Sequence, residues 1–252
     1  MPALSVCLEM LYTDRAFIDR FEPVADLGAD AVEFWTWQDK DLDAVERELD
    51  AHGLDLVGMV GTEGPLTDPG RIDETVAEIE RSVEVAADLD CPTLFVLTGD
   101  ERDDASRARQ RELVAEGLEA AAPAAEAAGV TLVLEPLNTA IDHPGYFLEA
   151  AEEGFDIVRT VDSPAVELLY DVYHQQVTEG NIIQTVTENV EDIGHVHVAD
   201  VPGRYEPGTG ELNYPNVVEA VEDAGYDGYF GFEFRAKEES DEAIQAGLSL
   251  RE

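Results

Sequence analysis

Short apolar runs alternate with longer amphipathic runs along the whole chain. Eight of the apolar runs are rich in Val, Leu and Ile, and each has the length of a single strand. Strands that are almost continuously hydrophobic are typical of a parallel sheet covered on both faces. The sequence therefore predicts strands at Leu4–Leu8, Ala31–Trp35, Leu56–Val60, Thr93–Thr98, Thr131–Leu137, Val166–Tyr173, His195–Asp200 and Tyr229–Phe234.

A helical pattern follows each predicted strand. Apolar residues recur there at helical spacing, and Gly28, Gly53, Gly129 and Gly225 stand where helices should end. We predict helices at Asp14–Leu27, Leu42–His52, Pro69–Leu89, Asp103–Ala128, Gly145–Thr160, Asn181–Val190, Tyr214–Ala224 and Asp241–Leu248.

Eight strands, each followed by a helix, predict the α/β class and a single (β/α)8 TIM barrel. We expect one domain over residues 1–252, because this length suits one barrel and no linker or low-complexity tract interrupts the chain. An open doubly wound sheet shows the same alternation and is the alternative. It usually carries a glycine-rich phosphate loop after its first strand, and neither a GxGxxG nor a P-loop pattern follows Leu8.

The chain is extremely acidic. It holds 57 Asp and Glu against 15 Lys and Arg, a formal net charge of −42, and only Lys40 and Lys237 are lysines. The acidic residues are spread along the amphipathic segments instead of being gathered in one tail. Self-repulsion of this size is screened in molar salt, where the Debye length is roughly 3 Å. We therefore expect a salt-adapted, cytoplasmic protein of a halophile.

Composition also limits the classes of partner. Nucleic-acid binding relies on basic patches that neutralise phosphates, and the sequence has none, so we expect no nucleic-acid partner. An apolar run of 18 or more residues and a signal peptide are both absent, so we expect no membrane association. Cys7 and Cys91 lie in or beside predicted buried strands without CxxC spacing, which indicates free buried thiols in a reducing compartment.

Polar residues stand at the ends of several predicted strands, including Glu9, Glu33, Asn138 and Asp200. In a barrel, the carboxyl ends of the strands form the active face. The most informative set is Glu135, Asp171, His197 and Glu233, from four successive strands. One carboxylate alone is explained by a helix cap or an arginine partner, but several buried together need a cation. We predict a metal site, and carboxylates with one imidazole suit Mg²⁺, Mn²⁺ or Co²⁺.

Neighbouring residues allow less direct interpretations. His174 follows Asp171 by three residues and is a candidate to donate a hydrogen bond to a substrate oxygen without binding the metal. His195 points to the same strand face as His197 but deeper, so we expect a satisfied histidine of the barrel interior. Asp200 has the opposite parity and is expected to anchor a loop, while Trp35 is either a pocket wall or a core residue.

At these positions the chain resembles the hydroxypyruvate isomerase family, within the xylose-isomerase-like barrel superfamily. The resemblance is densest from Thr131 to Arg235. Its main stretches are Glu135-Pro136-Leu137-Asn138, Tyr170-Asp171-Val172-Tyr173-His174-Gln175, Gly194-His195-Val196, Val201-Pro202-Gly203-Arg204, Glu206-Pro207-Gly208-Thr209-Gly210-Glu211 and Gly231-Phe232-Glu233.

The resemblance implies a divalent metal on Glu135, Asp171, His197 and Glu233, with Glu135 and Glu233 also the acid/base pair. It implies that hydroxypyruvate is converted to 2-hydroxy-3-oxopropanoate through an enediolate. His174 and Arg204 would bind the small-molecule substrate. An equal alternative for Arg204 is a loop salt bridge to Glu206 or Glu211.

Two positions depart from the family pattern. His197 stands where hydroxypyruvate isomerases are expected to carry glutamine, and Ala140 stands where relatives often carry arginine. The histidine favours a ketose 3-epimerase, whereas the loop from Pro202 to Pro215 favours a hydroxypyruvate isomerase.

Three further functions are compatible with parts of the sequence: a 2-oxo-tetronate isomerase, a sugar-binding barrel without catalysis and, more distantly, an endonuclease IV-like DNA repair enzyme. The repair enzyme needs further histidines and a basic face, which the sequence lacks. The sequence leaves the formation of a homo-oligomer open.

Overall fold

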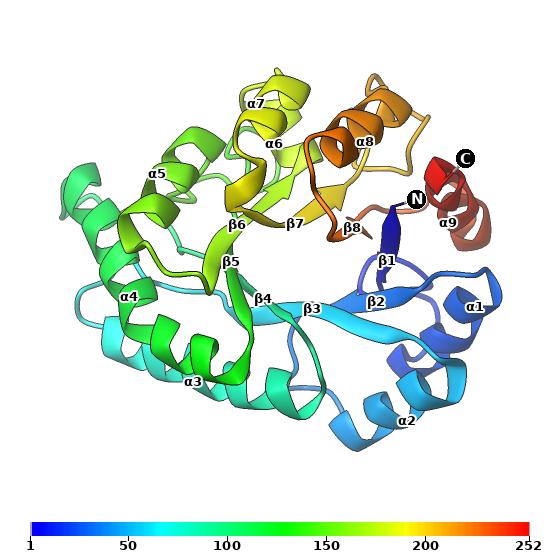
Figure 1. Cartoon of the computed structure of the whole chain (residues 1–252), viewed down its shortest axis with the longest axis horizontal. Coiled ribbons are helices and arrows are strands. Elements are labelled where there is room, and N and C mark those ends of the chain that lie inside the picture. The colour runs from blue at the N-terminus through cyan, green and yellow to red at the C-terminus, as the bar shows by residue number, and fades with distance from the viewer. Residues whose placement is uncertain (1, 252) are drawn as a thin grey trace.

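Eight parallel strands close into a barrel in the computed structural model, which describes residues 2–251 (Figure 1). Each strand pairs with the next along the chain, and the last pairs with the first. This confirms the predicted α/β class and (β/α)8 barrel. The strands are β1 Ala3–Cys7, β2 Ala31–Phe34, β3 Asp55–Thr62, β4 Thr93–Val96, β5 Thr131–Leu134, β6 Val166–Asp171, β7 Ile193–Val198 and β8 Tyr229–Phe232.

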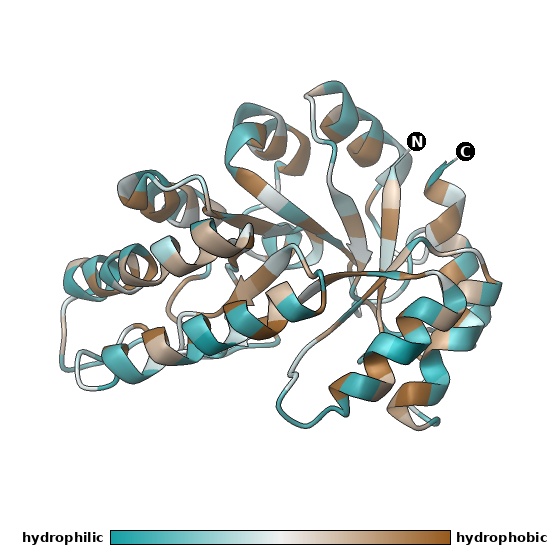
Figure 2. Cartoon of the chain, turned by 60° about the horizontal axis from the view of Figure 1, so that its bottom comes forward, coloured by the Kyte–Doolittle hydropathy of each residue, from teal (hydrophilic) through white to brown (hydrophobic). Residues whose placement is uncertain are grey.

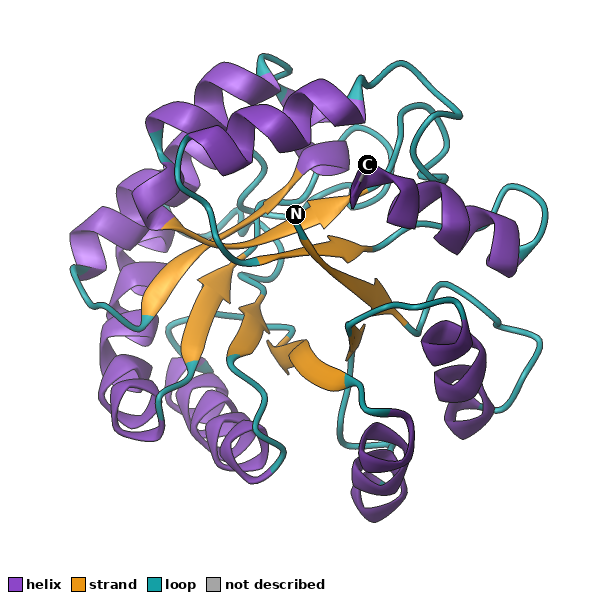
Figure 3. Ribbon diagram, turned by 45° about the vertical axis from the view of Figure 1, so that its right-hand side comes forward, coloured by secondary structure: helices purple, strands orange, loops and turns teal. Residues whose placement is uncertain are grey.

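Helices surround the barrel, as Figure 3 shows. Figure 2 shows largely brown strands, whereas the helices carry both teal and brown segments, which fits their amphipathic sequences. The helices are α1 Phe21–Asp26, α2 Leu42–His52, α3 Ile72–Asp88, α4 Arg107–Ala128, α5 Ala151–Val161, α6 Val172–Thr178, α7 Ile182–Glu188, α8 Tyr214–Asp223 and α9 Ser240–Leu248; 3₁₀ turns lie at η1 Phe17–Arg20, η2 Val190–Asp192 and η3 Ser249–Arg251.

Helix α6 was not predicted from the sequence, and the end of one predicted strand is wrong for that reason. The predicted strand Val166–Tyr173 ends at Asp171, and α6 begins at the next residue. The Asp171 side chain accepts hydrogen bonds from the backbone N–H groups of Tyr173 (2.8 Å) and His174 (3.1 Å) and so caps the helix. Apolar residues stand on both sides of Asp171, so hydrophobicity alone does not show that the strand ends there and a helix begins.

The predicted helix from Gly145 to Thr160 also starts too early, since α5 begins at Ala151. Gly145 has a φ of +96°, which ends any regular helix there. The next residues are tied to the end of β4: the Phe147 N–H donates to the Gly99 carbonyl (3.1 Å), and the Tyr146 hydroxyl accepts from the Thr98 N–H (2.8 Å). These bonds make 145–150 a loop beside the carboxyl end of the barrel.

The barrel interior has an apolar side and a polar side. Val60, Phe95, Val133 and Leu169 form a separate buried cluster on β3 to β6. The other side holds buried polar residues, and the His195 ring stacks on Phe95 with a centroid distance of 5.4 Å. The polar side is made by Ser5, Glu33, His195 and His197, all 2% exposed or less.

Two expectations from the sequence can be compared with the described part of the chain. Cys7 and Cys91 are buried and free, as predicted. Within residues 2–251, no helix combines the length and apolar character needed to cross a membrane.

The charge predicts how stability depends on salt. Raising KCl from about 0.1 to 2 M shortens the Debye length from roughly 10 Å to below 3 Å and screens repulsion among the acidic helices. We expect the thermal midpoint of unfolding to rise by about 5 °C or more, measured by circular dichroism. Sucrose, which adds no ions, is the control for general solute exclusion. A midpoint that is unchanged or lower in KCl would contradict salt adaptation.

Candidate active site

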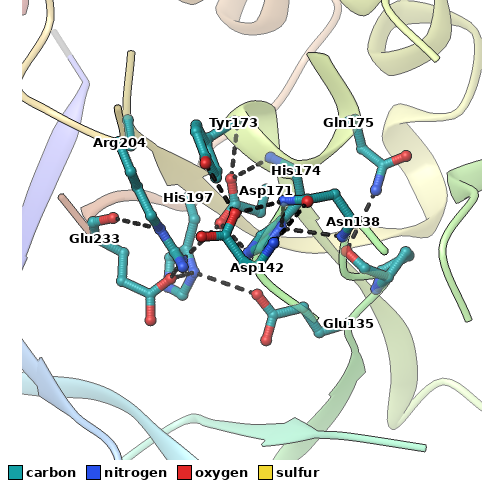
Figure 4. A network of polar contacts seen from close by, with 12 residues as sticks. Glu135, Asn138, Asp142, Asp171, Tyr173, His174, Gln175, His197, Arg204 and Glu233 are labelled. Atoms are coloured by element: carbon teal, nitrogen blue, oxygen red, sulfur yellow. Dashed lines mark hydrogen bonds and ion pairs between the residues drawn. The ribbon is translucent and has the colours of Figure 1, made fainter. Parts of the chain in front are cut away.

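Four side chains meet where β5, β6, β7 and β8 end (Figure 4). Glu135 directly follows β5, Asp171 is the last residue of β6, His197 lies near the end of β7, and Glu233 directly follows β8. All four are at most 7% exposed. Each offers a ligand atom, and these atoms lie within 4.8 Å of one another. The structure thus brings together the four residues that were predicted from the sequence to bind a metal.

The donor set fits a divalent cation. Nδ1 of His197 is buried without a hydrogen-bond partner among the described residues, and it lies 3.4 Å from Glu233 Oε2 and 3.8 Å from Glu135 Oε1. Ligands bound to one ion at about 2.0–2.6 Å lie at most about 4–5 Å apart. Three carboxylates also face a single guanidinium, that of Arg204, and a divalent cation would balance the remaining negative charge.

Asp171 has two tasks, one for each oxygen. Oδ1 accepts the two backbone hydrogen bonds that cap α6. Oδ2 faces the site, 3.3 Å from Arg204 Nη2. Burial raises the pKa of Asp171, although Arg204 and His197 oppose the effect. The helix cap therefore fixes the orientation in which this carboxylate reaches the site.

The environments of Glu135 and Glu233 push their pKa values apart. Burial, opposed in part by His197 and reinforced by the Glu233 carboxylate, raises the pKa of Glu135 to about 7. Burial would raise the pKa of Glu233 as well, but Arg204 and His197 outweigh it and hold the pKa well below its usual range. Trp35 Nε1 also donates to Glu233 Oε1 at 2.8 Å. One carboxyl can thus carry a proton near neutral pH while its partner stays ionised.

His174 is held as a neutral hydrogen-bond donor. Its Nδ1 lies 3.1 Å from the backbone N of Asn138, and a backbone N–H can only donate, so Nδ1 must accept. The proton of the neutral ring is then on Nε2, which is buried with no hydrogen-bond partner within residues 2–251 and lies 3.6 Å from Asp171 Oδ2. Burial, with Arg204 nearby, holds the pKa of His174 well below its usual range. The sequence marks Asn138 only as a polar residue at a strand end, so this orienting contact was not predictable.

Arg204 points into the site. Its Nη2 contacts Asp171 and forms a close ion pair with Glu233, and its Nε lies 3.3 Å from the Glu233 carbonyl. The alternative prediction, a salt bridge from Arg204 to Glu206 or Glu211, is wrong. Those two carboxylates accept instead from the Lys237 backbone N–H (3.0 Å) and from Gln176 Nε2 (3.2 Å), respectively.

Asp200 organises the loop that carries Arg204. Its carboxylate accepts four backbone N–H groups, at 2.8–3.0 Å, from Val201, Gly208, Gly210 and Leu212. The side chain is fully buried. Arg204 itself has a φ of +58°, and its N–H donates to the Asp200 carbonyl at 3.1 Å. The structure agrees with the loop-anchoring role that strand parity indicates.

A cavity of about 180 Å³ opens beside two of the four clustered residues, Glu135 and Glu233. Pockets for drug-sized ligands have about 300–1,000 Å³, so this one suits a small molecule. Glu135, His174, Arg204 and Glu233 line it together with an apolar wall of Val60, Phe95, Leu97 and Leu137. Trp35 lines it too and is 39% exposed, which favours a pocket wall over a core role. Among the described lining residues, Arg204 alone carries a permanent positive charge.

Comparison with known proteins agrees with this architecture. The model of the family described as "Xylose isomerase-like TIM barrel" matches residues 21–252, and the chain belongs to this family. A 2-oxo-tetronate isomerase of Cupriavidus necator is 37% identical, covering 94% of each chain. A hydroxypyruvate isomerase of Escherichia coli is 29% identical, covering 93% of this chain and 94% of its own. A solved structure called AP endonuclease, family 2, from Brucella melitensis has a TM-score of 0.93, with 30% identity and 99% of both chains covered.

Removing the carboxylate of Asp200 tests the loop anchor. In Asp200→Ala, four backbone donors lose their acceptor, and we expect the free energy of unfolding to fall by about 2–3 kcal/mol in urea titrations. Hydrogen exchange should quicken across 201–213. The exposed Asp227 supplies the control Asp227→Ala, which should match the unsubstituted protein. An equally protected loop in Asp200→Ala would show that other contacts hold it.

Proposed function

We propose that this protein is a metal-dependent isomerase that moves the carbonyl group between carbons 2 and 3 of a small 2-oxo acid. The observation that carries the proposal is the cluster of Glu135, Asp171, His197 and Glu233, whose ligand atoms lie within 4.8 Å of one another beside Arg204. The names of the relatives, 2-oxo-tetronate isomerase and hydroxypyruvate isomerase, support the reaction class.

The two named substrates share one chemistry. Hydroxypyruvate and a 2-oxo-tetronate both carry a carbonyl at carbon 2 and a hydroxyl at carbon 3, and the tetronate adds one hydroxymethyl group. The small cavity suits an acid of three or four carbons. Because the Cupriavidus necator relative is 37% identical, a 2-oxo-tetronate is the first substrate to test. Hydroxypyruvate, the substrate expected from the sequence, is second.

The proton transfer belongs to the two glutamates. A divalent cation of the Mg²⁺, Mn²⁺ or Co²⁺ type would supply stabilisation of the negative charge that develops on the substrate oxygens. Glu135 or Glu233 takes the proton from carbon 3, and the same group or the other returns a proton to carbon 2. The hydroxyl proton passes from the oxygen on carbon 3 to the oxygen on carbon 2, which completes the shift of the carbonyl group. Both carboxylates line the cavity and can therefore reach a bound substrate. Nε2–H of His174 donates to a substrate oxygen, which costs no charge change because the ring stays neutral.

Arg204 binds the substrate carboxylate in this proposal. It is the permanent cation of the cavity wall, and its planar guanidinium suits a carboxylate. The three carboxylates of the site would otherwise repel an acidic substrate. The proposal includes one domain over residues 1–252, and the acidic composition supports a salt-rich cytoplasm as the location of the enzyme.

A ketose 3-epimerase is the second candidate, because His197 supplies an imidazole where hydroxypyruvate isomerases are expected to have glutamine. Proton removal by the same two glutamates serves both reactions. Arg204 favours the acid substrate, since a neutral ketose offers it no carboxylate. A nucleic-acid substrate is disfavoured by the net charge of −42.

Deuterium exchange tests the proposed reaction. The protein is loaded with Mn²⁺ in 2 M KCl and D₂O and given 2-oxo-tetronates, hydroxypyruvate or ketoses. We expect deuterium at carbon 2 or 3 of an acid together with its isomer, both detected by NMR, and loss of turnover after EDTA treatment. Glu135→Gln and Glu233→Gln should each lower kcat by about 100-fold or more. Exchange with ketoses alone would indicate an epimerase instead of an isomerase. No exchange with any of these substrates would contradict both proposed functions.

Replacing Arg204 tests substrate binding separately from proton transfer. In Arg204→Lys the charge stays, but the forked contact is lost, so we expect KM for the acid to rise by about 10-fold or more. A neutral ketose, if turned over slowly, should be affected much less. Arg251, which pairs with Asp30 far from the site, supplies the control Arg251→Lys. Equal effects on acidic and neutral substrates would remove Arg204 from carboxylate binding.

A further inference from the structure

Glu33 is a fully buried carboxylate inside the barrel, on β2. It lies outside the four-residue cluster but contacts one of its members. Its Oε2 is 2.9 Å from Nε2 of His197, and its Oε1 is 3.0 Å from Nε2 of His195. The Ser5 hydroxyl on β1 donates a further short hydrogen bond to Oε1. A carboxylate in this position must be paired and hydrogen-bonded, and three partners from β1 and β7 meet that need.

The chemistry of these contacts fixes the histidine tautomers. An ionised carboxylate only accepts hydrogen bonds, so each imidazole must donate to it from Nε2. A neutral His197 ring then carries its lone pair on Nδ1. Nδ1 is the atom that lies 3.4 Å from Glu233 and 3.8 Å from Glu135 and has no hydrogen-bond partner among the described residues. The contact below the ring thus determines which nitrogen faces the cluster above it.

His195 also holds the Glu33 carboxylate in place. It occupies the other oxygen of Glu33, and its ring stacks on Phe95 of the apolar side. Gly231 on β8 leaves the space in which this contact forms, because a Cβ there would collide with Glu33 and come within 2.8 Å of the His197 ring. Glu33 can therefore neither rotate nor withdraw without losing a partner.

We propose that Glu33 is the positioning residue of the metal site, which holds His197 so that the Nδ1 lone pair points at the cation. The inference rests on the proposed function, because it assigns a role toward the metal of that same site. A carboxylate on the far nitrogen also makes an imidazole a stronger ligand, and loss of such partners typically costs about 10- to 100-fold in metal affinity. This pairing favours a transition metal such as Mn²⁺ over Mg²⁺.

Metal affinity tests the proposal without relying on turnover. Mn²⁺ alone is titrated into the metal-free full chain in 2 M KCl by calorimetry, with free Mn²⁺ followed by electron paramagnetic resonance. In Glu33→Gln we expect binding about 10- to 100-fold weaker, since an amide nitrogen must then face an imidazole that needs an acceptor. Glu167→Gln on β6 is the matched control, because in the described structure no hydrogen bond or ion pair joins Glu167 to either histidine, and this substitution should leave affinity unchanged.

A second measurement covers the case in which Glu33→Gln does not fold. The ¹⁵N shifts of His197 in the unsubstituted, Mg²⁺-loaded protein report which ring nitrogen carries the proton. We expect a protonated Nε2 and an unprotonated Nδ1. The opposite pattern, or a folded Glu33→Gln that binds Mn²⁺ like the control, would overturn the role of Glu33. If the unsubstituted protein binds no Mn²⁺, the metal-dependent function fails together with this inference, whereas a failure confined to Glu33→Gln leaves that function standing.

Discussion

The structure depends on the balance of buried charge at the carboxyl end of the barrel. Three carboxylates from three strands are held together out of water, and such a cluster survives only with cations or strong donors around it. Arg204 supplies part of that compensation, and the cluster of ligand atoms leaves room for a metal ion. The loop hydrogen-bonded to Asp200 carries Arg204 to this cluster. Charge compensation at the site therefore depends on the conformation of that loop.

The same requirement explains why the barrel interior is divided. A wholly apolar interior would leave the His197 ring without a partner, and a wholly polar one would not pack. Phe95 and its apolar neighbours fill one side, and Glu33 with its histidines fills the other. His174 is oriented in a different way. The backbone N–H of Asn138 donates to its Nδ1, and a backbone N–H can only donate. Two histidines of the site are thus held by opposite chemistry, one donating to a carboxylate and one accepting from an amide.

The barrel and the four clustered residues were predictable because both leave local marks. Apolar runs mark the strands, and a carboxylate that ends such a run is conspicuous. Glu33 is also conspicuous as a carboxylate in an apolar strand, but its contact with His197 was not predictable, because that contact spans 164 residues and depends on how the barrel closes. Helix α6 was not predicted because apolar residues stand on both sides of Asp171. The start of the helix is set by the Asp171 side chain, which caps it and also faces the site. The partners of Arg204 depended on loop geometry that spacing does not encode.

The pairing of β1 with β8 joins two parts of the chain that do different work. The clustered residues, His174 and Arg204 all lie between 135 and 233, whereas Trp35, Val60, Phe95 and Leu97 of the cavity wall come from the first hundred residues. Most of the apolar cavity wall and the clustered polar residues therefore come from separate stretches of the chain. Substitutions in the first stretch can reshape the cavity without replacing any clustered residue, provided that Glu33 is kept.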